Sequence, residues 1–241
     1  MERILKEEKE RKCLRLLYGI DSAINILVRL LMLPVLICGI YIIVDTIGVY
    51  ADAGAGKIKA QKPAVITDEE LKKISGNCVA WLELDGTDMD FPIMQSGNNT
   101  DYLNKDPYGN YSLAGSIFLD FRNSPDFTDE YSLVYGHHMS AGLMFGAMDG
   151  YTEKDYFKDH LAGKLTAGDK EYRLHVYAFI RCDAADSEVF NTYYPMEDRI
   201  RFFKEKAWYT DGSVDGKKIV ALTTCKAPGA TDRSVLICWI E

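Results

Sequence analysis

Several features that mark common protein classes are missing from this chain of 241 residues. Its six cysteines form no C-x-x-C pair and have no regular spacing, so the sequence indicates neither a zinc site nor a disulfide framework. No D-x-D-x-D-G loop is present, so no calcium site is expected either. The net charge is −8 and no stripe of Lys and Arg stands out, which argues against a nucleic-acid partner.

Long apolar runs are equally scarce, and the one that is present predicts a membrane anchor. The run LLMLPVLICGIYIIV occupies residues 30–44. As a helix it measures about 22 Å, short of a hydrocarbon core of about 30 Å. Extension to residue 50 gives about 31 Å and takes in Asp45. We therefore predict a single transmembrane helix at 30–50, and the alternative is a buried core helix.

Basic residues set the expected orientation of this anchor. They precede the run more often than they follow it closely, namely Arg3, Lys6, Lys9, Arg11, Lys12, Arg15 and Arg29 against Lys57, Lys59 and Lys62. The positive-inside rule then predicts a cytoplasmic segment at 1–29 and a large extracytoplasmic part. A cleaved signal peptide fits less well, because about 29 residues precede the run. Residues 51–66 are rich in Gly, Ala and Lys and read as a linker.

Residues 67–241 read as one mainly β domain. Thr67-Asp-Glu-Glu70 fits a capping box that opens a short helix ending at Ile74. Segments rich in β-branched and aromatic residues predict strands at 78–84, 91–95, 115–120, 131–137, 165–167, 172–181, 218–224 and 235–240. Helical patterns interrupt them at 144–148 and 195–208. About eight strands with a few helices predict a closed or nearly closed β-barrel.

One cysteine, Cys225, has a position in the sequence that suits a reactive thiol. The apolar strand KKIVALTTC ends at Cys225, a short loop follows, and a second strand begins near Arg233. A cysteine at a strand end is reachable by solvent, and the guanidinium of Arg233 offers paired donors to a carbonyl oxygen. A single cysteine taken alone is more often buried and inert. The other five cysteines are interpreted as non-catalytic, namely Cys13, Cys38, Cys78, Cys182 and Cys238. A disulfide among the last three of these is left open.

Only four histidines are present, and two of them follow a strand pattern directly. The segment YSLVYG delivers His137 and His138 into a loop, and since strand residues alternate between faces, at most one of them faces the cysteine. His160 and His175 are expected to be structural. Acyl transfer through a cysteine needs a thiolate, a proton partner for the leaving amine and a donor for the oxyanion.

These segments together resemble the sortase family, class B. The YGHHM stretch is similar to the family's histidine motif and assigns catalysis to His137. The LTTC stretch with its following arginine is similar to the cysteine motif, with Cys225 as nucleophile and Arg233 as its arginine. VAWLELDGTDMDFPIMQ, NNTDYLNKD and GSIFLDFRNS resemble successive core segments of class B members. The stretch 182–210 resembles their helix-bearing connection, and the likeness covers 67–241.

The resemblance implies a sortase-like barrel and a transpeptidase that needs no cofactor. Cys225 would attack a Thr carbonyl in a sorting signal similar to L-P-x-T-G or N-P-x-T-N on a secreted protein. His137 would protonate the departing amine, and Arg233 would stabilise the oxyanion. An amine of a cell-wall precursor or cross-bridge would then take the acyl group. The implied location is the extracytoplasmic face of the membrane in a Gram-positive-type envelope.

Substrate contacts are also implied by the resemblance. They correspond to Asn99 and Leu103 in the NNTDYLNKD segment and to Thr223, two residues before the cysteine. Tyr193 and Tyr194 of the long connection are further candidates, although simple packing explains them equally well.

Two other functions remain open at this stage. An extracytoplasmic cysteine hydrolase acting on cell-wall peptides would share the cysteine and histidine but let water resolve the thioester. Common enzymes of that kind place the cysteine before the histidine, the reverse of the order here. A membrane-tethered binding module on the same barrel has no need of a cysteine, a histidine and an arginine together.

Overall fold

The computed structural model describes residues 1–53, 62–225 and 231–241. For residues 2, 6, 7, 52, 53 and 225 it describes the backbone alone. The chain divides into two compact units, Met1–Gly48 and Val49–Glu241. Residues 54–61, which are half of the predicted linker at 51–66, and residues 226–230 lie outside the described residues.

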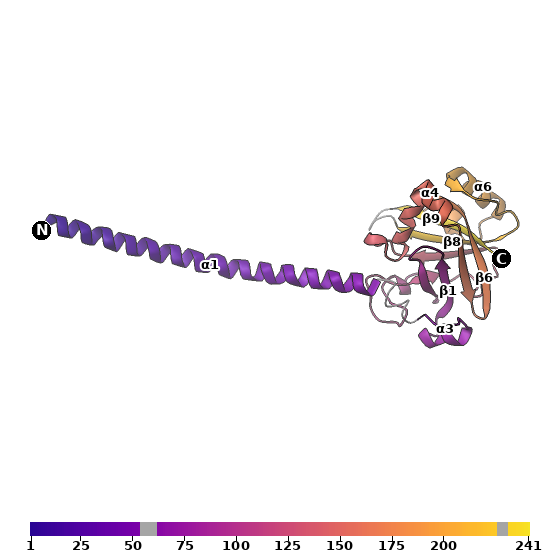
Figure 1. Cartoon of the computed structure of the whole chain (residues 1–241), viewed down its shortest axis with the longest axis horizontal. Helices are drawn as coiled ribbons and strands as arrows, with labels where there is room; N and C mark the ends of the chain where they lie inside the picture. Colours follow the sequence, from indigo (N-terminus) through magenta and orange to yellow (C-terminus); the bar gives the residue numbers. More distant parts are fainter. Residues whose placement is uncertain (54–61, 226–230) are drawn as a thin grey trace. The chain divides into compact units, whose positions relative to one another are not determined.

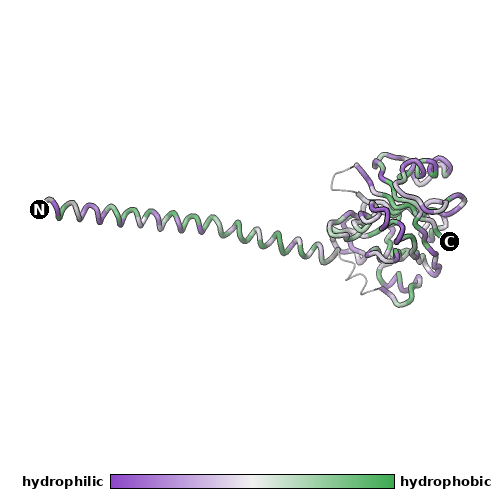
Figure 2. Tube along the Cα trace, turned by 45° about the horizontal axis from the view of Figure 1, so that its top comes forward, coloured by the Kyte–Doolittle hydropathy of each residue, from purple (hydrophilic) through white to green (hydrophobic). Residues whose placement is uncertain are grey.

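The first unit belongs to one long helix, α1, which spans Glu2–Ala53. Its 52 residues correspond to about 78 Å of helix. A part within Arg3–Ala51 is long and apolar enough to cross a membrane, and this range includes the predicted span at 30–50. Figure 2 shows the hydrophobic residues gathered in the part of α1 beyond its polar N-terminal turns. Their side chains are exposed, for example Leu30 at 63% and Ile43 at 60%, which suits a helix surrounded by lipid.

The second unit is built on one sheet that closes into a barrel (Figure 1). Its strand order is β5-β1-β2-β3-β4-β8-β9-β6-β7, and β5 also pairs with β6. Eight strands therefore form a ring, and β7 extends from one edge of the long β6. The strands of the described residues are β1 Cys78–Leu84, β2 Asp90–Met94, β3 Ile117–Leu119, β4 Tyr131–Gly136, β5 Ala162–Ala167, β6 Lys170–Asp183, β7 Ala207–Thr210, β8 Lys218–Cys225 and β9 Asp232–Ile240. The predicted closed barrel of about eight strands is confirmed.

Strands β8 and β9 are buried on both faces, which fixes their register. In β8, Val220 and Leu222 belong to the main core, whereas Ile219 and Ala221 belong to a second core that also contains Phe203 of helix α6. A slip of one residue would exchange the two faces of the strand. The same double burial explains why these strands read as nearly continuous apolar runs in the sequence. The positions of the strand ends, where the candidate catalytic residues lie, follow from this packing.

Short helices connect the strands. They are α3 Asp68–Ile74, η1 Asp101–Leu103, η2 Ser140–Gly142, η3 Phe145–Thr152, α4 Lys154–Asp159, α5 Ser187–Phe190 and α6 Met196–Lys206. The predicted helix start is confirmed at α3, where the backbone N–H of Glu70 donates to the Thr67 hydroxyl at 3.3 Å; this is the N-cap half of the predicted capping box, and the Glu70 carboxylate accepts from Lys73. Of the helix predicted at 144–148, residues 145–148 lie in the 3₁₀ segment η3, whereas Met144 precedes it with the non-helical angles φ 51° and ψ −133°.

The helix predicted at 195–208 ends earlier than its sequence pattern suggests. α6 stops at Lys206, and Ala207 has the extended angles φ −63° and ψ 129°. From there β7 pairs with β6, and the ring of Trp208 packs against Phe179 at 5.7 Å between centroids. The guanidinium of Arg181 lies 4.5 Å from the same Trp208 ring. These tertiary contacts override the local helical pattern over the last two predicted residues.

Candidate active site

The pairing of β4, β8 and β9 brings the predicted catalytic residues to one end of the sheet. β4 and β8 run parallel with Gly136 paired to Thr224, so His137 and Cys225 follow at the same end. β9 runs antiparallel to β8, and its Arg233 pairs with Cys225. Neighbouring strands lie about 4.8 Å apart, so the three backbones fall within two strand spacings, about 10 Å.

A cavity of about 280 Å³ lies at these strand ends. Its walls come from the β2–β3 connection, from β3, from β4 and the residue after it, from β8 and β9, and from the segment 184–190 that ends with α5. The lining residues are Asn99, Leu103, Phe118, Tyr135, Gly136, His137, Ala184, Phe190, Thr223, Thr224 and Arg233. Five of the eight predicted site residues are therefore among its walls. The backbone of Cys225 follows Thr224 directly, and the Cys225 side chain lies outside the described part of the chain.

The imidazole of His137 is held by a backbone carbonyl. Its Nε2 lies 2.7 Å from the carbonyl oxygen of Leu103. Because a carbonyl accepts and cannot donate, Nε2 is the donor in this hydrogen bond. The backbone N–H of Phe145 donates to the carbonyl of His137 at 3.1 Å and holds the loop from the other side. The ring is therefore restrained by groups outside its own strand.

A buried carboxylate, Asp120, joins several walls of the cavity. Nε and Nη2 of Arg122 donate to its two oxygens at 2.8 and 2.7 Å. Nδ2 of Asn99 and the hydroxyl of Tyr135 also donate to it, at 2.8 and 3.0 Å. Burial raises the pKa of Asp120, but the hydrogen bonds and charge of Arg122 outweigh this and hold the pKa below its usual value. No motif in the sequence marks Asp120 or Arg122 as a site residue.

Thr223 is another residue that lines this cavity. Its side chain is 1% exposed, and within the described residues its Oγ1 is buried without a hydrogen-bond partner. A buried hydroxyl of this kind costs free energy unless a ligand completes its hydrogen bonding.

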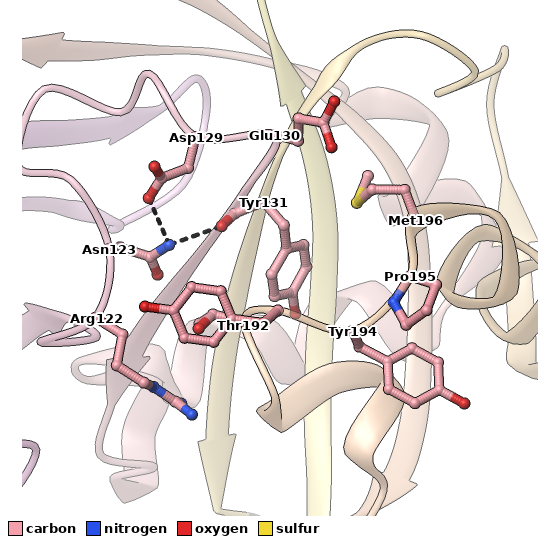
Figure 3. Close-up of a pocket in the computed structure, with 10 residues that line it drawn as sticks. Arg122, Asn123, Asp129, Glu130, Tyr131, Thr192, Tyr194, Pro195 and Met196 are labelled. Atoms are coloured by element: carbon pink, nitrogen blue, oxygen red, sulfur yellow. Dashed lines mark hydrogen bonds between the residues drawn. The ribbon is translucent and has the colours of Figure 1, made fainter.

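The two predicted tyrosines lie elsewhere. Tyr193 and Tyr194 line a separate hollow of about 370 Å³ beside Tyr131 and Arg122. Figure 3 shows Arg122 on one side of this hollow and Tyr194 on the other. Tyr193 is 76% exposed, and the hydroxyl of Tyr194 donates to Glu188 at 3.3 Å. Neither tyrosine lines the cavity that contains His137, so their substrate role stays a prediction.

Three of the remaining cysteines are buried free thiols. Cys78, Cys182 and Cys238 are at most 5% exposed. Burial raises the pKa of the Cys78 and Cys182 thiols to about 12, and it raises the pKa of Cys238 as well. Since the thiolate is the nucleophile, these thiols are unreactive near neutral pH. None of them forms the disulfide that the sequence had left open.

The other histidines have local partners. Nε2 of His138 lies 2.9 Å from a carboxylate oxygen of Asp149. The rings of His160 and His175 stack on Tyr156 and Trp239, each at 3.9 Å between centroids. Across residues 1–53, 62–225 and 231–241, no group of three or more His, Cys, Asp or Glu side chains is arranged to hold a metal ion.

Comparisons with known proteins agree with this barrel. A family model described as the sortase domain matches residues 82–240. Sortase B of Listeria monocytogenes is 33% identical over 162 residues, which cover 65% of each chain. Sortase B of Staphylococcus aureus is 29% identical over 163 residues, which cover 66% of this chain and 67% of that protein. The crystal structure of a Streptococcus pyogenes class B sortase involved in pilus biogenesis has a TM-score of 0.66 and 34% identity, covering 72% of this chain and 97% of that one.

The fold is thus that of a sortase-type cysteine transpeptidase. The chain belongs to the sortase family, and its relatives are class B members, so the class predicted from the sequence is confirmed. It spans about two thirds of the length of the curated relatives that it matches.

Proposed function

We propose that this chain is a membrane-anchored class B sortase that cleaves the sorting signal of a secreted protein after a threonine and joins the new acyl group to a cell-wall amine. The observation that carries the proposal is the strand register. It aligns the end of β4, just before His137, with the end of β8 at Cys225 and the start of β9 at Arg233, and both His137 and Arg233 line one cavity. Covalent exchange through a thioester conserves the energy of the broken peptide bond, which suits a compartment without ATP.

The proposed reaction uses these three residues in sequence. The Cys225 thiolate adds to the threonine carbonyl, and the guanidinium of Arg233 donates hydrogen bonds to the oxyanion that forms. His137 gives its proton to the departing amine as the C–N bond breaks, leaving a thioester on Cys225. The incoming amine then adds to the thioester, His137 accepts a proton from it, and the Cys225 thiolate departs. A new amide bond replaces the one that was cleaved.

The cavity provides candidate contacts for the peptide. Thr223 is one of the residues that line it. Leu103 adds apolar surface, and Asn99 lines the same wall. These contacts suit a short extended segment similar to L-P-x-T-G or N-P-x-T-N, as the family resemblance implies.

The anchor supports the proposed location. The apolar part of α1 suits a single membrane span, and the basic residues before it favour a cytoplasmic N-terminus. The catalytic unit would then act on the outer face, where secreted proteins and cell-wall precursors meet.

Mass spectrometry of the intact protein tests the proposal directly. Residues 49–241 are incubated with a small set of sorting-signal peptides, with the Cys225→Ala variant as control. The expected result is an acyl adduct on the wild-type protein that is absent from Cys225→Ala and that moves to an added amine such as triglycine. An adduct that water releases equally fast with and without the amine would instead favour a hydrolase. If no peptide forms an adduct while Cys225 still reacts with iodoacetamide, the proposed substrate class is wrong.

A further inference from the structure

We propose that Asp120 is a positioning residue for the transpeptidation proposed above, because this one carboxylate holds three separate walls of the active-site cavity. The walls are Asn99 after β2, Tyr135 in β4 and Phe190 in α5. They belong to segments that are far apart in the chain and that share no strand. The inference depends on the proposed function, since positioning has meaning only for a substrate that the cavity binds.

Two of the walls are held by direct contact. Asn99 and Tyr135 donate from their side chains to the same oxygen of Asp120, Oδ2. Asn99 is fixed at its other end as well, because the backbone N–H of Phe121 donates to its Oδ1 at 3.0 Å. The Asp120 side chain is fully buried, so water does not compete for these hydrogen bonds.

The third wall is held through Arg122. Its Nη2 donates to Asp120 at 2.7 Å and to the carbonyl oxygen of Phe190 at 2.9 Å. Arg122 also lines the neighbouring hollow, as Figure 3 shows, whereas Phe190 lines the active-site cavity. The guanidinium of Arg122 therefore lies between the two hollows, and the carboxylate of Asp120 fixes its orientation.

The chemistry of this cluster requires an ionised carboxylate. Every group that faces Asp120 is a donor: the guanidinium and backbone N–H of Arg122, the amide of Asn99 and the hydroxyl of Tyr135. An ionised carboxylate accepts from all of them, whereas an asparagine would turn an N–H₂ group toward at least one donor. Burial raises the pKa of Asp120, but the hydrogen bonds from Arg122 and Asn99 and the charge of Arg122 outweigh it and lower the pKa, so Asp120 is charged at neutral pH.

The cluster also connects to the groups that orient the catalytic histidine. Tyr135 lies in β4, two residues before His137, which directly follows the strand. Asn99 precedes η1, whose last residue, Leu103, holds the imidazole through its carbonyl. A displacement of about 1 Å at reacting groups can cost about a hundredfold in rate. We therefore expect loss of the Asp120 contacts to reduce kcat/KM by about ten- to a hundredfold.

The test uses the full-length chain in detergent micelles and an isosteric variant, Asp120→Asn. Measurements are kcat and KM for a cleaved sorting-signal peptide, the melting temperature, and the rate at which iodoacetamide alkylates Cys225. The expected result is a kcat/KM reduced at least tenfold with a raised KM, while the alkylation rate stays within about twofold of wild type. The matched control is Asp126→Asn, an exposed aspartate that accepts from Ser124 and Thr128 in the same loop region, and it should keep wild-type kinetics.

A second variant keeps the test decisive if Asp120→Asn fails to fold. Tyr135→Phe removes only the hydroxyl that donates to Asp120, and we expect it to lower kcat/KM severalfold without a change in melting temperature. Where both variants fold, their effects should not add, because they remove the same contact. Wild-type kinetics in folded Asp120→Asn, or in Tyr135→Phe if Asp120→Asn does not fold, overturn the positioning role. Failure of the wild-type protein to turn over any sorting-signal peptide counts against the proposed function instead.

Discussion

The carbonyl oxygen of Leu103 accepts a hydrogen bond from Nε2 of His137 at 2.7 Å. The position of that carbonyl depends on Gly115, which has φ +61° and no side chain to fill the space. A Cβ atom at Gly115 would lie 2.6 Å from the oxygen of Leu103 and 2.6 Å from that of Tyr102. Glycine is therefore needed here both for its backbone angle and for the close approach of η1.

We expect Gly115→Ala to displace the Leu103 carbonyl and so to disturb His137. The strained backbone angle alone costs about 1–3 kcal/mol in the free energy of unfolding. Misorientation of the imidazole should also lower kcat/KM by about tenfold under conditions in which the variant is folded. Urea unfolding and peptide-cleavage kinetics measure the two effects.

Gly109→Ala is the matched control for this substitution. Gly109 also has a positive φ, +87°, but a Cβ there would meet nothing within 4 Å. It should lose stability through backbone strain and keep wild-type kcat/KM. Equal losses of activity in both variants would show that the contact between Leu103 and His137 is not the cause.

The sequence predicts the barrel well because its central strands leave a clear signal. Burial on both faces turns β8 and β9 into apolar runs, and the N-cap Thr67 marks the start of α3. The sequence does not reveal β7, because its four residues are too few to show an alternating pattern. This strand forms by pairing with β6. The helical pattern before Trp208 therefore extends two residues too far.

The candidate site likewise has a part that the sequence predicts and a part that it does not. Motifs point to His137 and Cys225 because each follows an apolar strand, and the parallel register of those strands brings them together. The partners of Asp120 give no such signal, since Asn99 and Tyr135 are 21 and 15 residues away in the chain. Contacts of that kind depend on the closed barrel and leave no local pattern. Tyr193 and Tyr194 line a different hollow because of the path of the segment between α5 and α6, and the sequence does not predict that path.

Thiol labelling should separate Cys225 from the buried cysteines. The pKa of the Cys78 and Cys182 thiols is raised to about 12 by burial, so almost no thiolate is present at pH 7. We expect iodoacetamide to modify Cys225 in folded residues 49–241 and to leave Cys78, Cys182 and Cys238 unmodified until urea is added. Peptide mapping by mass spectrometry locates the label. Rapid labelling of Cys182 in the folded protein would contradict this expectation.

Arg233 should be intolerant of substitution by lysine. A guanidinium offers paired donors in a fixed plane, whereas an ammonium is a point charge on a flexible stem. We expect Arg233→Lys to lower kcat/KM by about a hundredfold or more, the usual cost of losing an oxyanion donor. Arg181→Lys is the control, because Arg181 packs over Trp208 and does not line the cavity. Nearly wild-type kcat/KM in the Arg233→Lys variant would remove Arg233 from the proposed mechanism.

The stability of the domain should fall in acid partly through Asp120. Its folded pKa is below the unfolded value of about 3.9, so the stabilisation is complete above that value and is lost as the pH falls through the folded pKa. Its hydrogen-bond partners Arg122, which is charged, and Tyr135, which is neutral, do not titrate in this range, because the pKa of each is raised above its usual value. We expect Asp120→Asn to be less stable than wild type at pH 7 and to lose less free energy of unfolding between pH 5 and pH 3. Urea unfolding at several pH values measures both curves, and parallel curves would exclude Asp120 as the cause.

The connection that carries Phe190 is organised by a buried arginine, Arg199 of α6, which is 0% exposed. Its Nη1 donates to the carbonyl of Glu188 at 2.8 Å, and its Nη2 donates to those of Asn191 and Tyr194 at 2.8 and 3.1 Å. Its guanidinium also lies 3.5 Å from the centre of the Tyr131 ring. One side chain therefore fixes the backbone between α5 and α6.

We expect Arg199→Ala to lower the free energy of unfolding by about 3 kcal/mol, because several carbonyls lose their donor and a buried side chain leaves a cavity. The looser connection should also raise KM for the peptide, since Phe190 forms one wall of the active-site cavity. Arg201→Ala on the same helix is the control. Arg201 is exposed and pairs with Asp198 within one turn, so its loss should cost at most about 0.5 kcal/mol. Similar unfolding curves for the two variants would mean that the carbonyl contacts of Arg199 contribute little, and that the strands beneath hold this wall of the cavity by themselves.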